Sequence, residues 1–235
     1  MKLINLPNII TCCNLLCGCM AVFFGLNGEV GTASLYIILG AVFDFFDGMT
    51  ARLLNISGPI GKELDSLADM VTFGVAPSVL CYQILGSYTL PYGWLPLLAF
   101  VMAAFSALRL AKFNCDERQS LSFIGLPTPA NALLWIGFIH LNAIGLIHEA
   151  LNGWYYLAAM FLLSWLLISE VPMFSLKIKS GHMGWAENKV RYSFLAACVA
   201  IFAVTAIAGP EYFKASPAYI ILLYIILSAV SAKKQ

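Results

Sequence analysis

Long stretches of apolar residues recur along the whole chain and are separated by short polar segments. A helix that crosses a bilayer needs about 20 mostly apolar residues, and backbone groups in lipid must be hydrogen-bonded within helices or closed barrels. The pattern therefore predicts an all-α membrane bundle that forms a single domain over residues 1–235. We expect about eight transmembrane helices, at Ile9–Leu26, Thr32–Leu54, Ser66–Leu85, Trp94–Phe113, Pro129–Ile147, Trp154–Ile168, Val190–Ala208 and Pro217–Ser231.

The charged residues support this reading and give the bundle an orientation. They make up 11% of the chain, whereas soluble domains carry about 25%. With eight spans, Lys214 falls alone on one side, and the other twelve of the 13 lysines and arginines fall on the opposite side. Because basic residues favour the cytoplasmic side, we expect both termini in the cytoplasm. The net charge of +1 indicates no nucleic-acid partner.

The cysteines and histidines do not indicate a metal site. Four of the seven cysteines crowd the first apolar stretch, and no pair has zinc-finger spacing, so we interpret them as small residues that pack between helices. The three histidines are isolated from one another and are expected to be structural: His140, His148 and His182.

Four of the five aspartates fall within 26 residues, at the ends of two neighbouring spans: Asp44, Asp47, Asp65 and Asp69. Residues three or four apart share a helix face, so each span carries a pair of carboxylates on one side. Asp44 lies about 15 Å inside its span at about 1.5 Å per residue, and a carboxylate at that depth indicates a functional site. The alternative is that the aspartates neutralise Arg52 and Lys62 at the membrane surface, which would account for only one or two of them.

Small residues share the face of the second span that carries Asp44 and Asp47. Gly48 and Ala51 leave room beside the carboxylates, and Arg52 follows with a guanidinium group that suits phosphate oxygens. Mg²⁺ and Mn²⁺ prefer oxygen ligands, and two such ions about 4 Å apart can promote phosphoryl displacement. The pattern predicts a divalent-metal site next to a phosphate-containing substrate at the cytoplasmic side.

The spacing of these residues resembles the signature of the CDP-alcohol phosphotransferase family. Asp44-x2-Asp47-Gly48-x2-Ala51-Arg52-x8-Gly61-x3-Asp65-x3-Asp69 matches every fixed position of D-x2-D-G-x2-A-R-x8-G-x3-D-x3-D. The surrounding sequence is similar to the bacterial and archaeal phosphatidylserine synthase branch, in the stretches Leu6–Gly18, Gly61–Asp69, Val71–Ser78, Arg109–Asn114 and Phe123–Ala130.

The resemblance implies a membrane transferase that uses CDP-diacylglycerol and L-serine, with two Mg²⁺ or Mn²⁺ ions held by Asp44, Asp47, Asp65 and Asp69. It implies that Asp69 is also the general base. The residues that it assigns to the CDP-lipid are Asn8, Thr11, Asp47, Gly48, Ala51, Arg52 and Gly61, although Asn8 and Thr11 would also suit a polar helix start that faces water. It further implies a homodimer in a prokaryotic cell membrane, with the site on the cytoplasmic side.

Recognition of serine requires a cation for its carboxylate. Arg109 and Lys112 lie three residues apart at the cytoplasmic end of the fourth span, where they are either serine ligands or basic anchors of the helix. Lys177 and Lys179 lie in the loop from Glu170 to Lys189, which is either a lid or a lipid head-group contact.

Three other functions fit parts of the sequence. A sibling transferase could use glycerol 3-phosphate or inositol phosphate, although a phosphorylated acceptor calls for a denser cationic pocket. A divalent-metal transporter would also carry membrane carboxylates, but here they gather near one side only. A purely structural membrane protein would leave the signature unexplained.

Overall fold

The computed structural model describes residues 4–56, 58–88, 91–116, 123–145, 152–174 and 185–232. The elements in this part of the chain are almost all helical, as predicted. They are α1 (Leu6–Leu26), α2 (Val30–Leu53), α3 (Pro59–Asp69), a π-helical segment (Met70–Val75), α4 (Ala76–Gly86), a 3₁₀ segment (Leu95–Phe100), α5 (Val101–Cys115), β1 (Phe123–Ile124), α6 (Thr128–Ile144), α7 (Asn152–Ile168), β2 (Pro172–Met173), α8 (Trp185–Ala208) and α9 (Pro210–Ala232).

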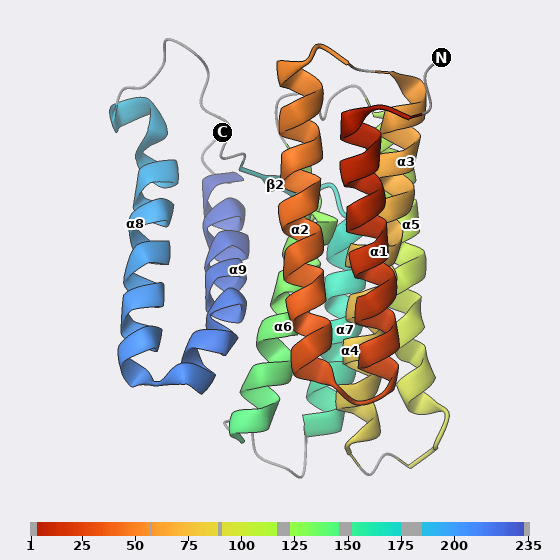
Figure 1. The fold of residues 1–235 in the computed structure, drawn as a ribbon. Helices are drawn as coiled ribbons and strands as arrows, with labels where there is room; N and C mark the ends of the chain where they lie inside the picture. Colours follow the sequence, from red (N-terminus) through yellow and green to blue (C-terminus); the bar gives the residue numbers. More distant parts are fainter. Residues whose placement is uncertain are drawn as a thin grey trace.

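Within the described residues the helices pass through the bundle eight times in alternating directions (Figure 1). Six helices are long and apolar enough to cross a membrane, and the described Gly153–Ile168 is a shorter apolar helix. The prediction of a helical membrane bundle is confirmed, while the count of eight spans stays a prediction. Lys177, Lys179, His148 and His182 lie outside the described residues.

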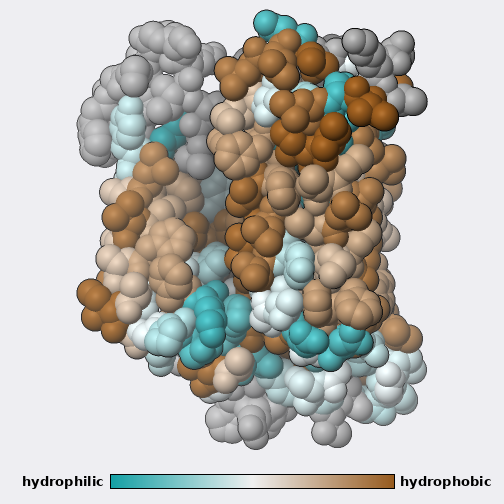
Figure 2. Space-filling view, in the orientation of Figure 1, coloured by the Kyte–Doolittle hydropathy of each residue, from teal (hydrophilic) through white to brown (hydrophobic). Residues whose placement is uncertain are grey.

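The outward surface of the helices is apolar, as a lipid environment requires. Large hydrophobic side chains such as Leu16, Phe45 and Ile207 are exposed, the last to 88%. Figure 2 shows apolar side chains over the middle of one face, and hydrophilic ones mainly toward its two ends. Burial of this surface in a hydrocarbon layer, rather than against protein, explains why so many apolar residues are exposed.

Local sequence signals set several helix ends. Asn5 caps α1 by accepting a hydrogen bond from the backbone N–H of Asn8 at 2.9 Å. Pro7 and Pro59 occupy the first turns of α1 and α3, where the missing N–H has no helical acceptor. Gly28 makes the turn from α1 to α2 with a φ of 81°, which favours glycine.

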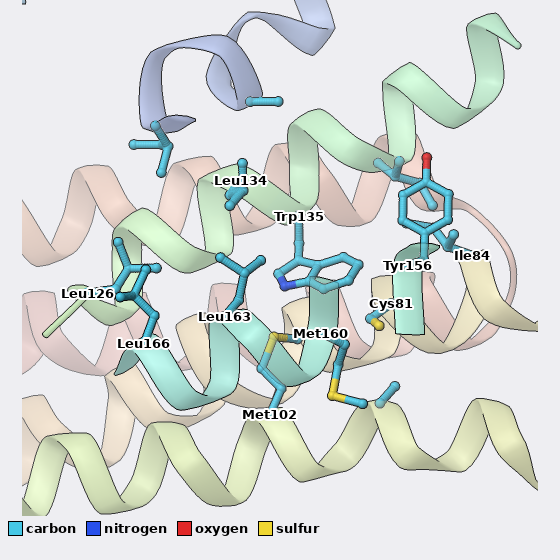
Figure 3. Packing of buried hydrophobic residues seen from close by; sticks show 14 of the residues in the cluster. Cys81, Ile84, Met102, Leu126, Leu134, Trp135, Tyr156, Met160, Leu163 and Leu166 are labelled. Carbon is cyan, nitrogen blue, oxygen red and sulfur yellow. The ribbon is translucent and has the colours of Figure 1, made fainter. Parts of the chain in front are cut away.

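The main core lies where α4, α5, α6, α7 and α9 meet. Trp135 of α6 is fully buried, and Figure 3 shows its ring among Leu163 and Met160 of α7. At one end of this core β1 pairs antiparallel with β2, with Phe123 opposite Met173. This short ladder ties the segment before α6 to the segment after α7.

Helices α6 and α9 approach each other closely at Gly137, which generates a prediction about stability. A Cβ at Gly137 would lie 2.7 Å from the Cα of Ala218, so Gly137→Ala should push the two backbones apart. We expect the free energy of unfolding to fall by about 1–3 kcal/mol, measured by thermal unfolding in detergent. Gly86→Ala in α4 is the matched control, because nothing lies within 4 Å of its added Cβ. Equal stability of the two variants would contradict the close packing.

Candidate active site

The structure brings the carboxylates of α2 and α3 together. Asp44, Asp47 and Asp65 each offer an oxygen atom, and these atoms all lie within 4.8 Å of one another. Asp69 lies one turn beyond Asp65 on α3, and Asp44 is within hydrogen-bonding range of it. The predicted convergence of the two pairs is therefore observed, with Asp69 beside a tighter group of three.

The acidic cluster lacks an ion-pair partner within the described part of the chain. Asp47 and Asp69 are buried, and among the described residues no lysine or arginine forms an ion pair with any of the four aspartates. One oxygen atom each of Asp47 and Asp65 is buried without a hydrogen-bond partner among the described residues. Buried carboxylates are costly unless they are paired or coordinate a metal. An all-carboxylate donor set of this kind fits a hard divalent cation.

A cavity of about 200 Å³ opens beside the cluster. Its wall contains six of the seven residues predicted to bind the CDP-lipid, and also Asp65. The predicted residues at its wall are Asn8, Thr11, Asp47, Gly48, Ala51, Gly61 and Asp65.

The first turns of two helices form part of the cavity wall, which the sequence analysis missed. Pro7 belongs to the first turn of α1, and Gly58 is the N-cap of α3. Helix N-termini carry a partial positive charge and unsatisfied N–H groups, so they favour anions such as phosphates. In the sequence, Pro7 and Pro59 indicate where these two helices begin, because proline is common in the first turn of a helix.

The small residues at the cavity leave space, as predicted. Nothing lies within 4 Å of a Cβ placed on Gly48, and a Cβ on Gly61 would be 3.4 Å from Oδ1 of Asn8. Thr11 donates a hydrogen bond from Oγ1 to the backbone oxygen of Pro7 at 3.0 Å. Asn8 and Thr11 are both buried, which argues against the alternative of a helix start that simply faces water.

The basic side chain that lines the cavity is Lys62, whereas the sequence predicted Arg52 there. Arg52 is exposed, its Nε donates to the backbone oxygen of Gly48 at 2.9 Å, and it is not among the cavity-lining residues. Lys62 lines the cavity instead, and its Nζ donates to the backbone oxygen of Asn114 at 2.8 Å. The sequence analysis had considered Lys62 only as a surface charge. A phosphate-binding role for Arg52 stays a prediction.

The two predicted serine ligands have different surroundings. Arg109 is 6% exposed, stacks over Phe113 at 4.8 Å from the ring centroid, and lies close enough to Asp69 for their charges to interact. Lys112 instead pairs with Glu170 at 2.5 Å and donates to the backbone oxygen of Ile168 at 3.3 Å. Arg109 therefore lies near Asp69 of the acidic cluster, whereas Lys112 joins α5 to the end of α7.

Comparison with known proteins decides the family. The sequence model of the CDP-alcohol phosphatidyltransferase family matches residues 4–166. The chain belongs to this family. The matched residues include those of the acidic cluster and the cavity, and Arg109.

Three relatives carry the same printed name, CDP-diacylglycerol–serine O-phosphatidyltransferase. The Bacillus subtilis protein is 45% identical over 124 residues, which cover 53% of this chain and 69% of the relative. The Mycobacterium leprae protein is 33% identical over 236 residues, covering 95% of this chain and 71% of the relative. The Helicobacter pylori protein of strain 26695 is 34% identical over 167 residues, covering 70% of each chain.

The open space at Gly48 generates a prediction about ligand binding. Gly48→Leu should extend into the cavity, because Gly48 lines it and nothing lies within 4 Å of a Cβ placed there. We expect normal thermal stability in detergent and loss of binding to a CDP-lipid, measured by calorimetry. Gly31→Leu is the matched control, since it lies on the same helix, also meets nothing within 4 Å and is remote from the cavity. Unchanged binding by Gly48→Leu would show that the nucleotide lies elsewhere.

Proposed function

We propose that the protein is a phosphatidylserine synthase, which transfers the phosphatidyl group of CDP-diacylglycerol to the hydroxyl group of L-serine and releases CMP. The observation that carries this proposal is the coincidence of the three-carboxylate cluster with a cavity lined by the family signature. The serine acceptor follows from relatives that bear this name, one of them aligned with 95% of the chain.

The four aspartates are proposed to hold the metal ions. Asp44, Asp47 and Asp65 would bind Mg²⁺ or Mn²⁺ directly, with Asp69 at the edge of the group, and the cluster offers enough oxygens for two ions. When bound, such ions neutralise phosphate charge and stabilise the negative charge that develops on a phosphoryl group and its leaving oxygen.

The cavity is proposed to bind the CDP portion of the donor. Gly48 and Ala51 let the nucleotide approach the backbone of α2, while the first turns of α1 and α3 face its phosphates. Asn8, Thr11 and Lys62 supply polar groups at the wall. A lipid substrate could keep its acyl chains in the membrane while its head group reaches this cavity.

Asp69 is proposed to be the general base. A carboxylate oxygen of Asp69 takes the proton from the serine hydroxyl, and the serine oxygen forms a bond to the phosphorus of the lipid. The bond from that phosphorus to the CMP oxygen breaks, and CMP leaves with its electron pair. A positioned base typically contributes about 10²–10⁴-fold to the rate.

Arg109 is proposed to bind the serine carboxylate. It is buried, it carries a guanidinium whose Nε has no hydrogen-bond partner within the described structure, and it lies near Asp69. A planar guanidinium suits a carboxylate ligand. Lys112 is less suited to this role, because Glu170 already neutralises it.

The proposal also covers the setting of the enzyme. The described basic residues Arg52, Lys62, Arg109, Lys112 and Arg191 lie toward the end of the bundle where α1 begins, and Lys214 lies at the other end. Under the positive-inside rule, the site faces the cytoplasm of a prokaryotic cell. We propose a single domain over residues 1–235, eight transmembrane helices and a homodimer.

The direct test is an assay of the purified protein with CDP-diacylglycerol, Mn²⁺ or Mg²⁺, and a panel of alcohols. We expect serine to be incorporated into lipid with release of one CMP per product. EDTA should abolish turnover and either metal should restore it, because buried carboxylates without a cation cannot hold a diphosphate.

Two results would contradict the proposal. Incorporation of glycerol 3-phosphate or inositol phosphate in place of serine would make the protein a sibling transferase. Uptake of Mn²⁺ into sealed vesicles without any lipid product would make it a metal transporter. Full turnover in EDTA would contradict the two-metal site but not the assignment of the substrates.

Arg109→Ala separates serine recognition from donor binding. Loss of a buried charged hydrogen bond costs about 1.5–3 kcal/mol, so the KM for serine should rise at least about tenfold with little change in affinity for CDP-diacylglycerol. Lys112→Ala, one turn along α5, is the control and should leave the KM for serine nearly unchanged. Equal loss of affinity for both substrates in Arg109→Ala would instead show that Arg109 orders the whole site.

A further inference from the structure

Asn14 is a fully buried polar residue of α1 whose side chain reaches the acidic cluster. Its exposed fraction is 0%, and its Nδ2 donates a hydrogen bond to Oδ1 of Asp69 at 3.2 Å. The bond connects α1 with the last residue of α3. An ionised carboxylate only accepts hydrogen bonds, so an amide NH₂ is a suitable neutral group to hold it.

The side chain of Asn14 is enclosed by three helical segments. Thr72 donates from Oγ1 to the backbone oxygen of Asn14 at 3.0 Å. A Cβ at Gly18 would lie 2.9 Å from the backbone nitrogen of Thr72, and a Cβ at Gly40 of α2 would lie 2.9 Å from Oδ1 of Asn14. Because both positions are glycine, α1, α2 and the π-helical segment pack closely enough to leave Asn14 little freedom to move away from Asp69.

The π-helical segment explains how Asp69 and Thr72 both reach the surroundings of Asn14. α3 ends at Asp69, and the π-helical turn begins at Met70. A π-helical turn contains an extra residue and so changes the direction of the side chains that follow, often at functional sites. Asp69, just before this turn, lies close to Asp44 and Asp65, and Thr72, within the turn, donates to the backbone of α1.

We propose that Asn14 is a positioning residue for Asp69. By holding Oδ1, Asn14 fixes the orientation of the carboxylate and leaves Oδ2 to accept the proton of the acceptor hydroxyl. The alcohol O–H bond breaks as the new O–H bond forms on Asp69, and the alcohol oxygen bonds to phosphorus as CMP leaves. This inference rests on the proposed function, in which Asp69 is the base.

The test compares Asn14→Leu with Thr72→Val. Asn14→Leu keeps the branched shape of the side chain and replaces the amide with methyl groups, whereas Thr72→Val removes a buried hydrogen bond between α1 and the π-helical segment without touching a carboxylate. We expect Asn14→Leu to lower kcat about 10- to 100-fold, the effect of a misplaced catalytic group, with little change in either KM. Thr72→Val should lower thermal stability and leave kcat of the folded enzyme close to that of the wild type.

A double variant provides a second measurement that a purely structural role would not reproduce. If Asn14 acts through the carboxylate of Asp69, Asn14→Leu should cause no further loss of kcat in an Asp69→Asn background. Asn14→Ser, which is smaller and still polar, replaces Asn14→Leu in both comparisons if the leucine variant does not fold.

The outcomes separate this inference from the proposed function. All variants are assayed with the alcohol that the wild type consumes. If that alcohol is not serine, the serine assignment is wrong, but the comparison of the variants still tests whether Asn14 positions Asp69. Wild-type kcat in Asn14→Leu, equal losses in Asn14→Leu and Thr72→Val, or additive losses with Asp69→Asn would each overturn the positioning role.

Discussion

The burial of several carboxylates between α2 and α3 is the constraint on which the rest of the site depends. An aspartate near the centre of a membrane helix costs about 2.5–3.5 kcal/mol in insertion, and here four lie near one another without an ion pair to any described lysine or arginine. Such an arrangement persists only if the surrounding helices fix it and a ligand completes it. The neighbouring cavity, the two helix N-termini at its wall and the open space at Gly48 are what a cation and a diphosphate require.

The precision of the site comes from close backbone packing rather than from hydrogen bonds within the cluster. Gly18 and Gly40 allow α1 and α2 to approach Thr72, which lies in the π-helical segment directly after Asp69. Interfaces between membrane helices are generally enriched in such small residues, because close contact replaces the hydrophobic driving force that water would supply. The same feature that stabilises the bundle therefore also determines where the carboxylate of Asp69 lies.

Much of the fold and the acidic cluster could be predicted from the sequence, because both follow local rules. Apolar length indicated the helices, and spacings of three and four residues put the aspartates of each helix on one face. The side-chain partners could not be predicted in this way. Arg52 folds back onto Gly48 of its own helix, Lys62 reaches the cavity, and Asn14 bonds to a residue 55 positions away. Such contacts depend on how the helices pack, and no periodicity in the sequence records that packing. The lower count of six clearly spanning helices arises because α6 and α7 have only 17 residues each.

Arg109 has neighbours both inside the region that the family model matches and beyond it. The cavity and the acidic cluster are built from α1, α2, α3 and the connection between α2 and α3, inside the region that the family model matches. Arg109 is close enough to both Asp69 and Tyr224 of α9 for their charges to interact, and the hydroxyl of Tyr224 donates to the backbone oxygen of Phe174 at 3.1 Å. Phe174 and Tyr224 both follow the last residue of the family match. The alignment of the Mycobacterium leprae relative covers 95% of the chain and so extends past the end of the family match, into the helices that follow it.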